Sequence, residues 1–275
     1  MTLSKQLKPL LLAALLVVAG NIFTISAATA GMLEDVQKRG TLRVGMATFV
    51  PWAMRDKDGN LIGFEIDVAT QVAEDMGVKV EFVPTAWSGI IPALIAKKFD
   101  IIIGGMSITP QRNLTVNFTT PYAHSGQQMA ANMQLAGDFK TREDFNSSDV
   151  TIACRRGATP CKAAQKLFPK ATVRRFDDDA QAFQEVVNGN AHGMISSAPK
   201  PRFWSDAHPT KVFLPFGDEN LTKGDEAFAL RKGDPDALNF FSNWIVVKTS
   251  NGWLQERHDY WFQDQSAWKD MVAPQ

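Results

Sequence analysis

The sequence predicts an α/β fold with largely parallel sheets, on two observations. Strand-like and helix-like hydrophobic patterns alternate along the chain, which is typical of β-α-β units. One design also occurs twice, in GGMSITP (104–110) and RRGATP (155–160), where a short glycine-containing loop leads into a Ser/Thr residue, a proline and a helix. In open α/β sheets such loops lie at the carboxyl ends of strands, where ligands bind. We therefore expect two lobes that direct two helix N-termini into one cleft.

The first set of predicted elements precedes residue 122. Apolar alternation, or an unbroken apolar run in the last case, predicts strands at residues 41–46, 78–83 and 101–103. Helical spacing of apolar residues predicts helices at residues 66–76 and 88–97. Ser88 is expected to cap the second of these helices. Glu65 and Asp67 are expected to be capping acids at the start of the first.

The second set of predicted elements follows residue 149. Strands are expected at residues 149–154, 171–176, 193–197, 211–216 and 226–231. Helices are expected at residues 160–168, 178–187, 236–248 and 252–262. Thr159 is expected to cap the first of these helices, as the counterpart of Thr109 in the first set.

The first thirty residues have the pattern of an export signal. Lys5 and Lys8 form a basic start, residues 10–19 form an apolar core, and residues 28–30 form a small-residue cleavage site. The alternative is a membrane anchor, but the apolar core is shorter than the roughly 20 residues needed to span a bilayer. We expect cleavage after residue 30 and an exported mature protein.

Composition limits the classes of function. The 275 residues carry 29 basic and 29 acidic side chains. Removing residues 1–30 takes away two lysines and no acid, so the mature chain has a net charge of −2. This balance argues against a surface for nucleic acid or anionic membrane. The length suits one large domain or two lobes of roughly 100–150 residues.

The two cysteines, Cys154 and Cys161, are close in sequence. In an oxidising compartment such a pair favours a disulfide, and the alternative is two buried free thiols. Two cysteines and four dispersed histidines have no metal-ligand spacing, so no metal site is expected. No cofactor is expected either.

Arg112 is the most informative single residue. If Thr109 caps a helix that begins at Pro110, Arg112 lies in the first turn, where the helix end is already partly positive. A cation is favourable there when an anion is bound by the N–H groups and the guanidinium together. The alternative is a solvated arginine paired with a surface acid.

Four stretches together carry a resemblance to a known family. They are GTLRVG (40–45) with PW (51–52), GNLIGFEIDVA (59–69), all of residues 87–122, and ALRKGD (229–234) with residues 253–262. The combination resembles bacterial solute-binding proteins of the polar amino-acid type, family 3, the periplasmic receptors of ABC importers. The resemblance covers essentially the whole mature chain. It implies two α/β lobes, joined by two crossing hinge segments, that close on a small ligand.

The resemblance also implies boundaries and partners. Lobe 1 would comprise residues 31–123 and 226–275, and lobe 2 residues 129–222. The hinge segments would be residues 124–128 and 222–227. The expected partners are a small carboxylate-bearing solute and the transmembrane subunits of an ABC permease, with no nucleic acid, and the protein is expected to be a monomer.

The resemblance further implies which residues hold the carboxylate of the ligand. Arg112 matches the arginine that clamps this group in a bidentate manner, which a lysine could not do equally well. Ser107 and Thr109 match neighbouring positions whose hydroxyl or N–H groups reach the same carboxylate. Gly105 matches the carbonyl that accepts a hydrogen bond from the ligand amine. Thr159 matches a hydroxyl of the second lobe that reaches the ligand on closure.

Aromatic residues complete the site that the resemblance implies. Phe49 and Trp87 match the walls on either side of the ligand, and Trp52 matches an aromatic residue behind that wall. The alternative for all three is a purely structural role in the core.

One position departs from the pattern of the family. An aspartate that pairs with the α-ammonium of the ligand usually ends the strand at residues 193–197, but this chain has Ser197 there, or Ser196 if the register differs by one. Because a buried ammonium without a counter-charge is costly, the ligand either lacks an α-ammonium or finds a counter-charge elsewhere, for instance among residues 177–179. Arg155 and Arg156 precede the second loop, so the second lobe suits a neutral or anionic group.

The sequence therefore favours a binding module without catalytic residues. The rival is an enzyme, because cyclohexadienyl dehydratases share this fold, but such chemistry needs a poised acid in the cleft and none is evident. A sensory ectodomain is less favoured because no second membrane span is evident.

Overall fold

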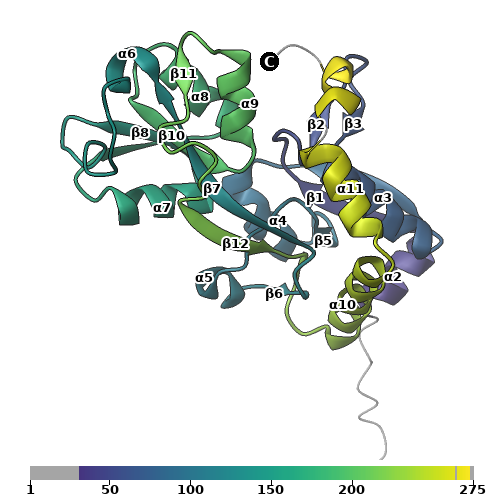
Figure 1. Cartoon of the computed structure of the whole chain (residues 1–275). Helices are drawn as coiled ribbons and strands as arrows, with labels where there is room; N and C mark the ends of the chain where they lie inside the picture. Colours follow the sequence, from purple (N-terminus) through teal and green to yellow (C-terminus); the bar gives the residue numbers. More distant parts are fainter. Residues whose placement is uncertain (1–30, 264, 273–275) are drawn as a thin grey trace, which may run out of the picture. The chain divides into compact units, whose positions relative to one another are not determined.

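The structure is a computed structural model that describes residues 31–263 and 265–272. It has the predicted α/β class, with two β-sheets, each covered by helices, as Figure 1 shows. The expected signal peptide, residues 1–30, lies outside the described residues. None of the described helices is long and apolar enough to cross a membrane.

The first sheet has the strand order β4-β1-β5-β13-β6. Its strands are β1 (Thr41–Met46), β4 (Lys79–Pro84), β5 (Ile101–Ile102), β6 (Asn117–Phe118) and β13 (Ala229–Leu230). Strands β1, β4 and β5 are parallel, and β13 is antiparallel to β5 and β6. The strands predicted at residues 41–46, 78–83 and 101–103 are therefore present, within one or two residues at their ends.

Helices bury both faces of the first sheet, as the unbroken apolar run at β5 predicts. On one face Ile101 and Ile103 pack in a core that includes Val68 and Val72 of α3 (Phe64–Asp75). On the other face Ile102 packs with α4 (Ile90–Ile95). Further helices near this sheet are α2 (Met32–Arg39), α10 (Pro235–Ser250) and α11 (Trp253–Phe262), beside a small hairpin of β2 (Met54–Arg55) and β3 (Leu61–Ile62).

The second sheet has the order β11-β7-β10-β8-β9, with β12 also paired to β7. Its strands are β7 (Ala123–Asn132), β8 (Thr151–Arg155), β9 (Thr172–Phe176), β10 (Gly193–Ser197), β11 (Val212–Phe213) and β12 (Thr222–Glu226). Helix α7 (Thr159–Leu167) packs on one face, and α8 (Asp179–Val187) and α9 (Lys200–Ala207) pack on the other. A one-turn helix, α6 (Met133–Ala136), follows β7.

The expectation of largely parallel sheets is only half correct. Strand β8 is parallel to β9 and β10, but β7 is antiparallel to β10, β11 and β12. Strands β7 and β12 pair over residues 123–127 and 222–226, between the regions where the chain belongs to one sheet and to the other. This ladder supplies the two crossing segments of a two-lobed fold. The domain and hinge boundaries given above stay predictions.

The capping residues predicted for three helices are wrong. Ser88 lies inside a 3₁₀ turn (Trp87–Gly89), and Gly89 takes the N-cap position of α4. Thr159 is the first residue of α7, whose N-cap is Ala158. Glu65 and Asp67 do not cap α3, because Glu65 binds Tyr122 and Asp67 accepts a hydrogen bond from the Trp261 indole. In each case the side chain has a tertiary partner or a turn position that local spacing does not reveal.

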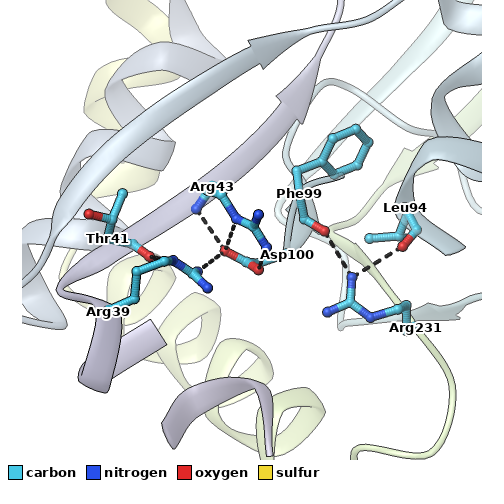
Figure 2. Close-up of polar contacts among 7 residues, drawn as sticks. All are labelled: Arg39, Thr41, Arg43, Leu94, Phe99, Asp100 and Arg231. Atoms are coloured by element: carbon cyan, nitrogen blue, oxygen red, sulfur yellow. Dashed lines mark hydrogen bonds and ion pairs between the residues drawn. The ribbon is translucent and has the colours of Figure 1, made fainter. Parts of the chain in front are cut away.

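A buried carboxylate lies at the start of the central strand β5 of the first sheet, and Figure 2 shows its contacts. Asp100, just before β5, accepts hydrogen bonds from the backbone N–H and the guanidinium of Arg43 and from Arg39 at the end of α2. Arg231 follows β13 and donates to the carbonyl oxygens of Leu94 (3.1 Å) and Phe99 (2.8 Å). The arginines thus tie the α4–β5 connection to the neighbouring strands.

Candidate functional site

Arg112 lies where segments of the two sheets meet. Its Nη1 donates to the carbonyl oxygen of Ser107 (2.7 Å), and its Nη2 donates to the carbonyl oxygen of Gly157 (3.1 Å) in the loop after β8. Among the described residues no acidic side chain forms an ion pair with it, so the alternative of a surface ion pair is not what the structure contains. Burial, together with the charge of Arg155, lowers the pKa of Arg112 to about 10.

The helix that carries Arg112 is shorter than expected. It is a single turn, α5 (Pro110–Asn113), although Thr109 caps it as predicted by accepting a hydrogen bond from the Arg112 N–H at 3.2 Å. A single turn has a small dipole, because the macrodipole sums over aligned peptide units. The positive character of this place therefore comes from guanidinium groups rather than from a helix end.

Hydroxyl groups from both sheets lie next to Arg112. The Ser107 Oγ lies 3.4 Å from the Thr159 Oγ1, which also accepts a hydrogen bond from the Gln127 side chain at 3.2 Å. The structure therefore brings the predicted residues Ser107, Thr109 and Thr159 to one place with Arg112. Their binding roles stay predictions.

Glu226 is a site neighbour that sequence reasoning missed. It ends β12, is almost fully buried, and accepts hydrogen bonds from Ser125 (2.6 Å) and Ser107 (3.5 Å). Burial raises its pKa to about 7, and the Ser125 hydroxyl opposes this rise. The sequence offered one signal, an acid inside a predicted hinge segment.

Gly105 holds a position that only glycine fits. Its φ is +63°, and a Cβ there would lie 2.9 Å from the Phe49 ring and 3.2 Å from the Trp52 ring. Its N–H donates to the Tyr122 hydroxyl (3.1 Å), which in turn donates to Glu65 (2.6 Å). The backbone at Gly105 can therefore pack directly against the predicted aromatic wall.

The two predicted aromatic walls, Phe49 and Trp87, lie on either side of the Arg155 guanidinium. The Arg155 Cζ lies 5.0 Å from the ring centroid of Phe49 and 4.8 Å from that of Trp87. Trp52 is fully buried and stacks behind Phe49, with 5.7 Å between ring centroids, which agrees with its predicted place behind the wall. Arg155 was noted in the sequence only as a charge before the second loop.

Ser197 ends β10 as predicted and pairs in register with Gln127 of β7. One alternative given above was a counter-charge for the ligand among residues 177–179. Of these, Asp179 already forms ion pairs with Arg155 and Lys200. Its Oδ2 lies 3.6 Å from the Arg155 Nε and 3.5 Å from the Lys200 Nζ, and its Oδ1 lies 3.4 Å from the Ser196 hydroxyl.

The Asp179 cluster is buried and positively charged. Burial alone would raise the pKa of Asp179, but the charges of Arg155 and Lys200 outweigh burial and lower it. Burial lowers the pKa of Lys200 to about 8, with Asp179 opposing the fall. Lys200 begins α9, which the sequence pattern did not predict, so no local signal placed it here.

A cavity of about 400 Å³ opens beside this cluster. Its lining includes Phe49, Arg55, Asp178, Asp179 and Lys200. Volumes of about 300–1,000 Å³ are typical of small-molecule sites. Among the described residues no group of His, Cys, Asp and Glu side chains is arranged to hold a metal ion.

The predicted disulfide is present. Cys154 and Cys161 are joined with 5.3 Å between their Cα atoms, which links the end of strand β8 to the first turn of α7. Arg155 and Gly157 both lie in the short loop that this bond encloses. The disulfide therefore restrains the segment that faces Arg112.

Comparisons with known proteins agree with the resemblance. The family model for bacterial extracellular solute-binding proteins, family 3, matches residues 42–264. The L-cystine-binding protein TcyJ of Escherichia coli (strain K12) is 30% identical over 238 residues, which are 86% of this chain and 88% of that protein. Cyclohexadienyl dehydratase of Pseudomonas aeruginosa is 27% identical over 232 residues, 84% of this chain and 86% of the enzyme.

Among solved structures, a binding component of an ABC transporter from Wolinella succinogenes, complexed with lysine, is 37% identical, with a TM-score of 0.78. The match covers 84% of this chain and 99% of that chain. The relatives thus include binding proteins and an enzyme. From the matched family model, the shared two-lobed α/β fold and the identities above, this chain belongs to the bacterial extracellular solute-binding proteins of family 3.

Proposed function

We propose that the chain is the periplasmic substrate-binding component of an ABC importer and captures a small carboxylate-bearing solute, an amino acid or related organic acid, between its two lobes. Membership of the family and the ABC-transporter relative from Wolinella succinogenes support this role. The partners would be the transmembrane subunits of a permease, and the protein would act as a monomer.

The observation that carries the proposal is the arrangement of Arg112. Its guanidinium is half-buried, has no acidic partner among the described residues, and is held by two carbonyl oxygens from opposite sides of the cleft. An arginine has five N–H donors, so donors remain for a carboxylate. The hydroxyls of Ser107, Thr109 and Thr159 and the carbonyl of Gly105 would complete the contacts, with the ligand next to Phe49 and Trp87 and near Ser197.

A thermal-shift screen over amino acids and organic acids tests the proposal. A ligand at 100 times its Kd stabilises the folded protein by about 2.7 kcal/mol, which raises the melting midpoint measurably. We expect Arg112→Ala to abolish the shift and Arg112→Lys to retain only part of it, because lysine cannot form the bidentate contact.

The control for this screen is Arg142→Ala, which removes a surface arginine that pairs with Glu219. It should leave the shift unchanged. A full ligand shift in folded Arg112→Ala would contradict the role given to Arg112.

A second candidate function is an enzyme similar to cyclohexadienyl dehydratase. The buried Glu226, with a pKa of about 7 and a hydroxyl neighbour at the cleft, has the properties of a general acid. Incubation with prephenate separates the two functions, since turnover would favour the enzyme and reversible binding without turnover the receptor. Loss of turnover in Glu226→Gln would identify the acid.

A further inference from the structure

The space between the aromatic walls is already occupied by a positive charge. The Arg155 guanidinium lies about equally far from Phe49 and Trp87, at distances where a cation is attracted to both rings. Its side chain is only 7% exposed. A cationic group of a ligand could enter this slot only by displacing Arg155.

The charges around the slot do not cancel. Arg112, Arg155 and Lys200 lie around it, and among the described residues Asp179 is the one carboxylate paired with this group. The guanidinium of Arg112 lies over the same Trp87 ring as that of Arg155, at 5.9 Å. A buried excess of positive charge is costly, and a bound anion would remove the cost.

The pairing of Asp179 with its two cations is also loose. Both contacts, at 3.6 and 3.5 Å, exceed the roughly 2.7–2.9 Å of a good charge-assisted hydrogen bond. The Nε of Arg155 is buried and has no hydrogen-bond partner. A buried donor without an acceptor is unfavourable, so Arg155 and Lys200 together offer donors to one more anionic group.

We propose that the ligand is a small dianion, such as a linear dicarboxylate, with one carboxylate on Arg112 and the other on Arg155 and Lys200. Cationic amino acids are excluded because Arg155 itself fills the aromatic slot and because Ser197 supplies no carboxylate for an ammonium group. This inference rests on the proposed function, since it names the class of solute taken by the same site.

Isothermal titration of the full mature protein tests the inference with three kinds of probe. These are linear dicarboxylates of three to six carbons, neutral zwitterions such as L-glutamine, and the cations L-lysine and L-arginine. We expect at least one dicarboxylate to bind at least tenfold more tightly than any zwitterion or cation.

Variants of Arg155 sharpen the test. Arg155→Ala should weaken dicarboxylate binding by roughly 10- to 100-fold, the usual range for a hydrogen-bonded charge. It should also gain binding of L-lysine or L-arginine, because the slot is open and Asp179 has lost a partner. Arg155→Lys keeps the positive charge and controls for a folding defect in Arg155→Ala. It should still exclude L-lysine.

Two further variants serve as comparison and control. Lys200→Gln should weaken dicarboxylate binding without admitting L-lysine, because Arg155 still fills the slot. Arg142→Ala changes an exposed arginine that pairs with Glu219, and it should leave every affinity unchanged.

The outcomes separate the inference from the proposed function. Binding of amino-acid zwitterions or cations that equals or exceeds dicarboxylate binding would overturn the inference and leave the solute receptor standing. If no carboxylate of any kind bound, the proposed function would fail and the inference with it. Unchanged dicarboxylate affinity in folded Arg155→Ala would also overturn the inference.

Discussion

Glu65 shows how a single buried acid shapes the behaviour of the protein. It has no exposed surface and accepts a hydrogen bond from Tyr122 at 2.6 Å. Burial raises its pKa to about 8, and the Tyr122 hydroxyl opposes this rise. Glu65 is therefore neutral in the folded protein at neutral pH, whereas in the unfolded chain it ionises near its ordinary value of 4.5.

The sign of the pH dependence follows from this difference. Between about pH 4.5 and 8 the folded state holds a proton on Glu65 that the unfolded state has lost. Glu65 alone therefore makes the free energy of unfolding fall as pH rises, by about 1.4 kcal/mol per pH unit. We expect Glu65→Gln, which keeps the shape and the acceptor for Tyr122, to flatten this slope. Urea unfolding at pH 5, 6, 7 and 8 measures the free energy of unfolding of both proteins. If it depended on pH in the same way in both, the raised pKa of Glu65 would be contradicted.

At the residue scale the sequence predicted the Thr109 cap next to Arg112, but it did not predict the charged residues around them, and the ligand-binding roles stay predictions. Thr109, Pro110 and Arg112 are adjacent in sequence, so capping chemistry alone predicted their geometry. Arg155, Asp179 and Lys200 come from the ends of three different elements and meet only through the tertiary fold. No local pattern reveals such a meeting.

At the scale of elements, the predicted strands were found because the apolar pattern marks a buried sheet. Residues 124–128 were expected as a hinge segment rather than as part of the long strand β7, because they are polar and lack an apolar strand pattern. In the structure, backbone pairing to β12 holds them in the strand. Helix α9 was missed because KPRFWSDA has a proline and few apolar residues at helical spacing. Both cases depend on partners that are distant in sequence.

The Asp100 cluster supports a prediction for the first sheet. Asp100→Ala would leave the Arg43 N–H without its acceptor and remove the partner of two guanidinium groups. Because both arginines are partly exposed, we expect the free energy of unfolding to fall by about 1–3 kcal/mol, less than the cost of breaking a fully buried ion pair. Urea unfolding measures the loss.

Asp100→Asn is the matched variant, because its carbonyl still accepts from the Arg43 N–H. It should lose less stability than Asp100→Ala. Equal losses of stability in the two variants would mean that the charge of Asp100, rather than its hydrogen bond to the backbone, stabilises the start of β5 (Figure 2).

At the scale of the whole molecule, the charge of the proposed site differs from the charge of the rest of the chain. The 275 residues have a net charge of zero, and without the expected signal peptide the net charge would be −2, whereas the proposed site is positively charged. A charged cleft raises the association rate of an oppositely charged solute, and salt screens this attraction over about 10 Å at 0.1 M.

We therefore expect the association rate of a dicarboxylate, measured by stopped-flow tryptophan fluorescence, to fall several-fold between about 0.01 and 0.5 M NaCl. A zwitterion should show a much weaker dependence. A dicarboxylate rate that does not change with salt would argue that the cluster is not reached by the solute during binding.

The disulfide makes the local structure depend on the redox state of the compartment. The Cys154–Cys161 bond closes the loop that presents Arg155 and Gly157 to the opposite lobe, and such bonds persist only in oxidising compartments. For the proposed receptor, a copy in the reducing cytosol would lack this restraint and would bind solute less tightly than an exported copy. The proposed receptor would then bind solute fully only after export.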